Sequence, residues 1–280
     1  ALLLGAVMIG FAPIFVRLTD VGYTACAFWR AALALPVLAI VARPRVHQLQ
    51  WNSLRWLLLA GLFFGADLAV WHQSIRLTSV ANATLLANFA PVFVTGAAVL
   101  VLHERVRASF VGGLVLALAG AATLVGNSAL QGGGNVLGDL CGIGASVFYA
   151  GYLIVVARAR SRYRAAEVML WTSLATAALL LLIASVEHET MWPQSARGWG
   201  VVLGLALLSQ VLGQGLIAYA LAHLSAAFSA AGLLVQPVAA ALLAWLLLGE
   251  PFGWRQGIGG VIVLAGIVLC RLSMPTAPPE

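Results

Sequence analysis

SVANATLLANFAPVFVTGAAVLVLHE, residues 79–104, returns without a gap as SAAFSAAGLLVQPVAAALLAWLLLGE, residues 225–250. In each copy an apolar segment is interrupted by proline and is followed by a short polar turn that carries a glutamate, and a second apolar segment comes after the turn. The positions that recur are Ser79, Pro91, Glu104, Gly113 and Gly120 in the first copy and Ser225, Pro237, Glu250, Gly259 and Gly266 in the second. Self-similarity at a fixed offset indicates an internal duplication.

The composition is that of an integral membrane protein. Hydrophobic residues make up 62% of the 280 positions and charged residues 9%, and the mean hydropathy is +1.00, so a soluble domain could not hide the apolar surface. The net charge of +6 comes from arginines in short loops, which indicates membrane topology rather than a nucleic-acid partner. The sequence contains no lysine, which excludes a Walker A loop and a Schiff-base lysine. We therefore expect neither an enzyme nor a bound cofactor.

Ten apolar segments match the roughly 20 residues that a helix needs to cross a bilayer. They are residues 2–18, 23–42, 54–75, 80–102, 110–126, 136–157, 167–186, 198–221, 226–249 and 254–272. The fold class we predict is an all-α integral membrane protein of ten transmembrane helices. It divides into a first five-helix repeat (1–126), a linker loop (127–135), a second five-helix repeat (136–274) and a disordered tail (275–280). Since the chain begins with Ala1, we expect a short N-terminal piece to precede it.

The arginines predict the orientation of these segments. With the N-terminus inside, ten of the fifteen arginines fall in cytoplasmic loops and four in outward loops, which places both termini in the cytoplasm. Five segments per half is an odd number, so the second repeat is predicted to have the inverted topology. The glutamate turns agree, because Arg105 and Arg107 follow Glu104 whereas only Arg255 follows Glu250 closely. Inverted repeats are typical of secondary transporters.

The repeated Ser, Pro, Glu and Gly positions, together with Phe28-Trp29-Arg30, resemble those of the drug/metabolite transporter superfamily. The resemblance is to its EamA-type ten-helix members, which include bacterial exporters of aromatic and other amino acids. It covers essentially the whole chain. It implies a helix bundle around a central cavity that alternates between inward-facing and outward-facing states in the inner (plasma) membrane of a prokaryote. It also implies a small-molecule substrate, although no cargo signature can be quoted. We expect the chain to function as a monomer.

Prolines within the predicted spans mark candidate hinges. Each proline removes the hydrogen bond to the carbonyl four residues earlier and bends its helix. Pro13, Pro91 and Pro237 are our hinge or gating candidates, and Pro91 and Pro237 occupy equivalent positions in the two repeats. A static kink that improves packing is the alternative for each of them.

Arg30 and Asp67 are charged residues deep within predicted spans, where a charge costs roughly 2.5 to 3.5 kcal/mol on insertion scales. Their spans are consecutive and antiparallel, and both residues lie about 18 to 20 Å from the cytoplasmic loop at 1.5 Å rise per residue. We predict an intramembrane charge pair that is structural or gates transport. A proton-coupling or cargo-binding role for the carboxylate is the alternative.

Polar and aromatic side chains inside the spans are the candidates for substrate binding, because an amide cannot face lipid cheaply. Gln210 and Gln214 lie four apart on one helix face and suit a zwitterion. The residues that we expect to contact cargo are Phe11, Phe15, Trp71, His72, Tyr149, Trp171, Gln210 and Gln214. Further polar or aromatic residues within the spans, which should also point inward, are Trp29, Asn82, Asn88, Tyr152, Tyr219 and Gln236. For each of these residues taken singly, ordinary packing is the alternative to a role in substrate binding. We predict no metal site, and we expect Glu187-His188-Glu189 to form a solvated outward loop.

These features predict a secondary-type transporter that exports small metabolites, with amino acids, including aromatic and apolar ones, as the expected cargo, by alternating access around a central cavity. Within the same superfamily, drugs, nucleobases, vitamins or sugar derivatives are the alternative cargo. A passive pore and a membrane scaffold are rivals from other classes.

Overall fold

The computed structural model describes residues 1–43, 51–78, 80–100, 106–125, 135–250 and 252–274. Ser79 and Glu104 of the first repeat copy lie outside these ranges, as do residues 127–134 of the predicted linker and the predicted tail.

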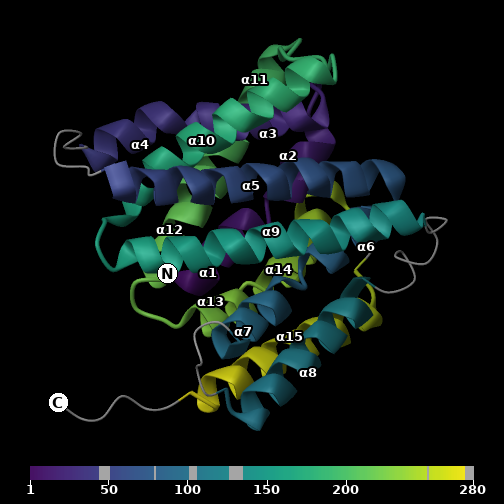
Figure 1. Cartoon of the computed structure of the whole chain (residues 1–280). Coiled ribbons are helices and arrows are strands. Elements are labelled where there is room, and N and C mark those ends of the chain that lie inside the picture. Colours follow the sequence, from purple (N-terminus) through teal and green to yellow (C-terminus); the bar gives the residue numbers. More distant parts are fainter. Residues whose placement is uncertain (44–50, 79, 101–105, 126–134, 251, 275–280) are drawn as a thin grey trace.

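Every element of the described ranges is a helix (Figure 1). In chain order the helices are α1 (Leu2–Ile9), α2 (Ala12–Leu18), α3 (Tyr23–Ala32), α4 (Ala34–Ala42), α5 (Trp51–Leu77), α6 (Val80–Ala87), α7 (Ala90–Leu100), α8 (Ala108–Val125), α9 (Val136–Arg160), α10 (Ala165–Val186), α11 (Ala196–Gly204), η3 (Leu205–Gln214), α12 (Gly215–Ala220), α13 (Ala226–Gly232), α14 (Val235–Leu248) and α15 (Trp254–Leu272).

Nine helical segments of the described residues are long and apolar enough to cross a membrane. They correspond to nine of the ten predicted spans, and the remaining one, Leu2–Leu18, is a shorter apolar helix. Large apolar side chains face outward from many of these segments, among them Ile40, Leu100 and Leu272, each more than 70% exposed. The chain is thus a multi-pass helical membrane protein, while the count of ten stays a prediction.

Four spans are interrupted at the places that their prolines predict. The helix ends are Ile9, Ala32, Ala87 and Gly232, and the prolines that follow them are Pro13, Pro36, Pro91 and Pro237. Ile9, Ala32 and Ala87 each lie four residues before their proline, and this is the residue whose carbonyl loses its hydrogen bond because the proline has no N–H. Gly232 lies five residues before Pro237. The next helix begins two or three residues later in each case. The predicted kinks are therefore confirmed, whereas movement at them is untested.

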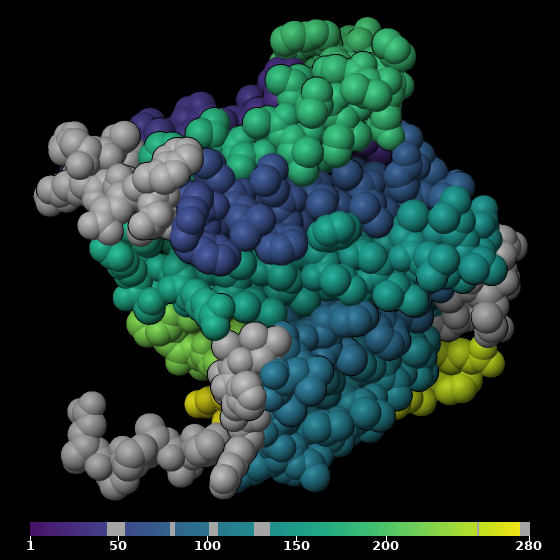
Figure 2. Space-filling model, in the orientation of Figure 1, coloured from purple at the N-terminus to yellow at the C-terminus, as the bar shows by residue number. Residues whose placement is uncertain are grey.

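Helices α5 and α9 lie side by side through the middle of the molecule (Figure 1). They form adjoining bands on the face shown in Figure 2. The hydroxyl of Ser74 on α5 donates a 2.7 Å hydrogen bond to the carbonyl of Gly138 on α9. A Cβ built on Gly138 would lie 2.9 Å from Cβ of Leu77, so the small residue allows this approach.

Helices α8 and α15, the last of each predicted repeat, pack against each other through glycines (Figure 1). A Cβ on Gly113 would lie 2.8 Å from the carbonyl oxygen of Gly266, and a Cβ on Gly120 would lie 2.8 Å from that of Gly259. Both distances are too short for real side chains, so the backbones are in direct contact. In the two repeats, Gly259 is equivalent to Gly113 and Gly266 is equivalent to Gly120. Each of the two α8 glycines therefore contacts the equivalent of the other one.

The eighth predicted span contains a ten-residue π-helix, η3, between α11 and α12. This wider helix is rare and is frequently found at functional sites. Here η3 packs against α1, where a Cβ on Gly5 would lie 2.8 Å from the carbonyl oxygen of Gly213. The sequence predicts an ordinary α-helix for the span 198–221, so the π-helical geometry is a difference from the prediction.

Candidate functional site

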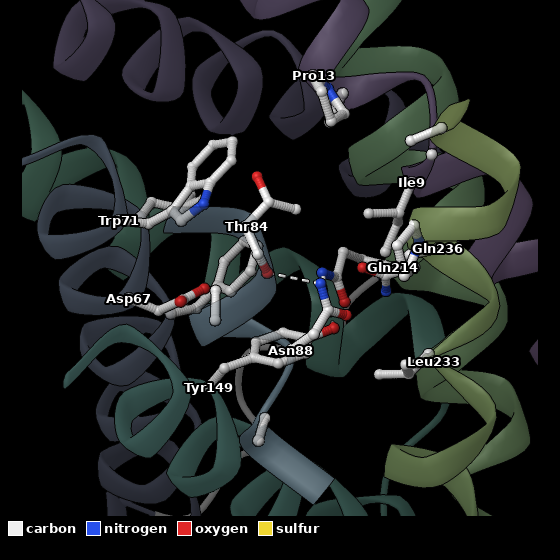
Figure 3. Close-up of a pocket in the computed structure, with 18 of the residues that line it drawn as sticks. Ile9, Pro13, Asp67, Trp71, Thr84, Asn88, Tyr149, Gln214, Leu233 and Gln236 are labelled. Carbon is white, nitrogen blue, oxygen red and sulfur yellow. Dashed lines mark hydrogen bonds between the residues drawn. The ribbon is translucent and has the colours of Figure 1, made fainter. Parts of the chain in front are cut away.

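A cavity lies between the interrupted helices, at the three breaks that precede Pro13, Pro91 and Pro237 (Figure 3). Its walls come from both predicted halves, and it encloses about 840 Å³ including its open mouth. Gly10 and Asn88, which lie within two of the breaks, are part of the lining. The proline breaks therefore put irregular backbone next to a cavity, which is where membrane proteins tolerate it.

One face of α5 supplies a wall of the cavity. Phe64, Asp67, Leu68 and Trp71 line it, and their spacing of three, four and seven residues places them on one side of the helix. Only 8% of Asp67 is exposed, and its carboxylate points into the cavity in Figure 3. An acidic group is thus held within an otherwise apolar helix face.

Arg30 of α3 also lines the cavity and is 5% exposed. Its Nε donates a 3.0 Å hydrogen bond to Oε1 of Gln210, and its guanidinium carbon lies 5.3 Å from the centre of the Phe64 ring. Its Nη2 is buried without a hydrogen-bond partner. Among the described residues no ion pair joins Arg30 to Asp67. In this conformation the predicted charge pair shares a cavity without direct contact, so its role stays a prediction.

Amides and the phenol of Tyr149 form another part of the lining, and the buried Tyr152 lies behind it. Nε2 of Gln214 donates to the Tyr149 hydroxyl and Oε1 accepts from the Tyr152 hydroxyl, each at 3.4 Å. Asn88 donates from Nδ2 to the carbonyl of Thr84 at 2.7 Å (Figure 3). Nε2 of Gln236 is buried without a partner. Together with the charged groups, these side chains make the cavity able to bind a polar molecule.

The structure brings eight of the thirteen predicted site residues to this cavity: Pro13, Arg30, Asp67, Trp71, Pro91, Tyr149, Gln214 and Pro237. It places the other five, Phe11, Phe15, His72, Trp171 and Gln210, outside the lining. The residues at the cavity include the three candidate hinges and both intramembrane charges. The five residues outside the lining make other contacts instead.

Gln210 and Gln214 do not act as one amide pair. Gln210 is 1% exposed, bonds to Arg30, and donates from Nε2 to the hydroxyl of Ser173 at 3.0 Å. It therefore lies behind the wall and supports Arg30, whereas Gln214 reaches the cavity.

The aromatic exceptions are packing residues in this conformation. Phe11 and Phe15 stack on each other with ring centres 6.3 Å apart. The Phe15 ring fills the space beside Gly204, where a Cβ would lie 2.9 Å from it. Trp171 is partly buried against the main core.

His72 is 2% exposed, and its ring centre lies 5.9 Å from that of Tyr23 and 5.0 Å from that of Trp71. Neither of its ring nitrogens has a hydrogen-bond partner among the described residues.

A model of the EamA-like transporter family matches residues 1–126 and 136–272. The chain belongs to this family. It is accordingly a membrane transporter and not an enzyme.

This EamA-like transporter has named relatives. It is 26% identical over 245 residues to the pseudopaline exporter CntI of Pseudomonas aeruginosa, covering 87% of this chain and 84% of that protein. It is 29% identical over 268 residues to the probable terminal-alkyne amino-acid exporter of Streptantibioticus cattleyicolor, covering 92% and 87%. A crystal structure of a protein at 20% identity superposes with a TM-score of 0.80 over 97% of this chain and 95% of that one, which shows the fold alone.

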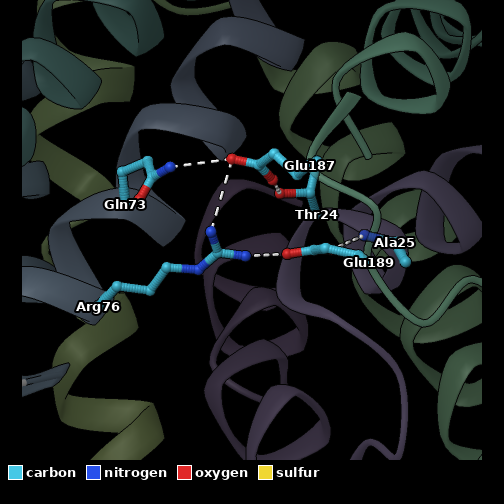
Figure 4. A network of polar contacts seen from close by, with 6 residues as sticks. All are labelled: Thr24, Ala25, Gln73, Arg76, Glu187 and Glu189. Carbon is cyan, nitrogen blue, oxygen red and sulfur yellow. Dashed lines mark hydrogen bonds and ion pairs between the residues drawn. The ribbon is translucent and has the colours of Figure 1, made fainter. Parts of the chain in front are cut away.

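The EamA-like transporter also carries a polar cluster at the end of α5, here called the outer network (Figure 4). Its members are Thr24, the main chain of Ala25, Gln73, Arg76, Glu187 and Glu189. The guanidinium of Arg76 lies between the two carboxylates and pairs with both of them, with 3.5 Å to Glu187. The outer network joins the end of α5 to the start of α3 and to the segment after α10.

The prediction of a solvated loop at residues 187–189 is wrong for both carboxylates. The side chain of Glu187 is 22% exposed and that of Glu189 is 7% exposed. Thr24 and Gln73 donate to Glu187 at 2.8 and 2.9 Å. The two carboxylates lie more than 100 residues from Arg76 in the chain, so sequence spacing alone does not indicate this pairing.

Proposed function

We propose that this chain is a secondary-type exporter of small metabolites, with amino acids as its cargo, that works as a monomer in a prokaryotic plasma membrane. The observation that carries the proposal is the cavity at three helix breaks, lined by Arg30, Asp67 and Gln214 as well as by aliphatic side chains. Such a cavity can hold a charged headgroup and an apolar side chain together. Substrate sites at broken helices are a recurring feature of secondary transporters.

The named relatives support export and point to the cargo. One is named an exporter of pseudopaline and one a probable exporter of a terminal-alkyne amino acid. Amino acids fit the lining better than uncharged drugs or nucleobases do, since a cargo without charge would leave Arg30 and Asp67 unpartnered in the bilayer.

Inverted repeats support alternating access. The family model matches twice, over residues 1–126 and 136–272, as two copies of one unit would. The glycine contacts between α8 and α15 are those that a twofold axis would produce. If each glycine is replaced by its equivalent in the other repeat, the contact of Gly113 with Gly266 becomes the contact of Gly259 with Gly120. We infer ten helices in two inverted halves that rock about the cavity.

Efflux from proteoliposomes tests this function. The purified full chain is reconstituted into liposomes loaded with the twenty amino acids, and release is followed by mass spectrometry. We expect saturable efflux that external amino acid accelerates, which a passive pore would not show. Ala87→Trp, which fills the cavity, should abolish efflux, while Val115→Trp on the exposed face of α8 should retain it. Efflux no faster than from protein-free liposomes would reject amino acids as cargo.

A further inference from the structure

The guanidinium of Arg30 is fixed in place but incompletely satisfied. Gln210 holds its Nε, and Ser173 in turn holds the amide of Gln210. These contacts set the direction of the guanidinium and leave Nη2 buried without a partner at a residue that lines the cavity. Arginine carries five N–H donors and stays charged in proteins, so this group is ready to receive an anion.

Asp67 presents the opposite charge in the same cavity. It lies on α5 one turn beyond Phe64, the ring that faces the guanidinium of Arg30. Among the described residues its carboxylate has neither a hydrogen bond nor an ion pair, although only 8% of the residue is exposed. The oxygens face the cavity space in Figure 3.

Two opposite charges in one low-dielectric cavity would ordinarily be paired, because each is costly alone within the bilayer. Here Gln210 holds the Nε of Arg30 instead. A molecule that carries only one charge would satisfy one of the two groups and leave the other. A molecule that carries both charges a few bonds apart would satisfy both.

We infer that Arg30 and Asp67 together recognise the zwitterionic headgroup of an α-amino acid. The guanidinium of Arg30 binds its carboxylate, Asp67 binds its ammonium group, and Gln210 is the positioning residue behind Arg30. This inference rests on the proposed function and adds how cargo is selected. The aliphatic wall, including Leu68, Leu153 and Leu233, receives the side chain of the cargo, so selection acts on the headgroup.

The recognition mode predicts which molecules are refused. Capping the amine as an N-acetyl group removes the partner of Asp67, and converting the acid to an amide removes the partner of Arg30. Each change leaves one buried charge unsatisfied, and the loss of one charged hydrogen-bonding partner weakens binding about 10- to 100-fold. Sites built for a polar group reject analogues that lack it far more strongly than they reject changes of apolar size.

Competition in counterflow tests the inference. Liposomes that contain the full chain take up an isotope-labelled mixture of the twenty amino acids, in the presence of unlabelled amino acids, N-acetyl amino acids or amino-acid amides outside. Asp67→Asn and Arg30→Gln are compared with wild type. Arg255→Gln is the matched control, since it removes an equal charge from an exposed position away from the cavity.

We expect unlabelled amino acids to compete in the wild type and both capped mixtures to compete at least about 10-fold more weakly. Asp67→Asn should lose discrimination against N-acetyl amino acids only, and Arg30→Gln should lose discrimination against amides only. A misfolded protein cannot produce this crossed pattern, and the wild-type comparison stands even if a variant does not fold.

Capped mixtures that compete equally well in the wild type would overturn the inference and leave the proposed function intact. The inference would also be overturned if both variants lost competition by all three kinds of competitor to the same extent. Absence of any amino-acid counterflow would overturn the proposed function itself.

Discussion

Oε1 of Gln210 accepts a hydrogen bond of 3.0 Å from Nε of Arg30, a residue 180 positions away in the chain. The bond joins η3 to α3 behind the wall of the cavity. Since the amide is only 1% exposed, it cannot contact cargo in this conformation. Gln210 thereby acts on the site only through the direction that it gives to the guanidinium.

Replacement of Gln210 should therefore change selectivity more than stability. In Gln210→Ala the guanidinium is free to turn toward Asp67, and we expect efflux to fall about 10-fold while thermal stability in detergent falls by about 1 kcal/mol. Discrimination against amino-acid amides should fall as well, which a purely structural role would not cause. Gln256→Ala, at the start of α15, is the control. Wild-type discrimination in Gln210→Ala would show that Arg30 does not depend on this bond.

Pro237 and Pro36 offer a matched test of hinge movement. Both follow a helix break, but only Pro237 lines the cavity. Pro237→Ala supplies the missing N–H and can close the break, so we expect the transport rate to fall at least about fivefold with stability unchanged or raised by up to about 3 kcal/mol. Pro36→Ala should change transport by less than about twofold. Equal rates for both variants would indicate that the kink near the cavity is static.

Helix breaks were predictable because their cause is local. A proline removes one hydrogen bond from a carbonyl that can be named from the sequence, and the breaks at Ile9 and Ala87 fall on those carbonyls. Asp67 and Trp71 were equally accessible to helix periodicity, because residues four apart share a face. Both indeed line the cavity.

Contacts between distant segments were not predictable in the same way. Periodicity places Gln210 and Gln214 on one face but does not say which of them meets Arg30, and the π-helical geometry of η3 has no signal in the sequence. Asn88 and Gln236 reach the cavity because they lie beside the proline breaks. Both are amides within predicted spans, which is the signal that the sequence offers for them.

Arg76 and Glu189 should show strong energetic coupling. Arg76→Gln leaves the carboxylate of Glu189, which is 7% exposed, without its cation. Because the arginine is a third exposed, we expect a loss of about 1 to 2 kcal/mol of stability rather than the larger cost of a fully buried pair. Glu189→Gln in the Arg76→Gln background should recover most of the loss. A double-mutant cycle from thermal unfolding in detergent measures the coupling, and additive losses would show that the pair contributes little.

Compartment labelling tests the inverted topology. Ser109 at the start of α8 and Trp254 at the start of α15 are exposed positions just after the equivalent turns of the two repeats. We expect Ser109→Cys to react with a membrane-impermeant maleimide only in inside-out vesicles, and Trp254→Cys only in intact cells. Of the native cysteines, Cys26 and Cys270 are buried but Cys141 is partly exposed, so both substitutions are made in a Cys141→Ser background, and that background is the labelling control. Reaction of both substituted positions in one compartment would contradict inverted repeats.

Neighbouring glycines on α8 separate helix packing from helix propensity. A Cβ on Gly113 would lie 2.8 Å from backbone atoms of α15, whereas a Cβ on Gly112 would meet no atom within 4 Å beyond its own stretch of α8. Gly113→Val should therefore cost about 1 to 3 kcal/mol through overpacking, and Gly112→Val should cost far less because its side chain points into open space. The repeat equivalent Gly259→Val should match Gly113→Val, since its Cβ would lie 2.8 Å from the carbonyl oxygen of Gly120.

Thermal unfolding in detergent measures these costs, and efflux per folded molecule provides the second measurement. Because no residue of α8 or α15 lines the cavity, Gly113→Val should lower the amount of folded protein without changing the discrimination among competitors. Equal stability of the Gly112→Val and Gly113→Val proteins would mean that α8 and α15 separate readily. Altered discrimination in Gly113→Val would mean instead that this helix pair moves together with the cavity during transport.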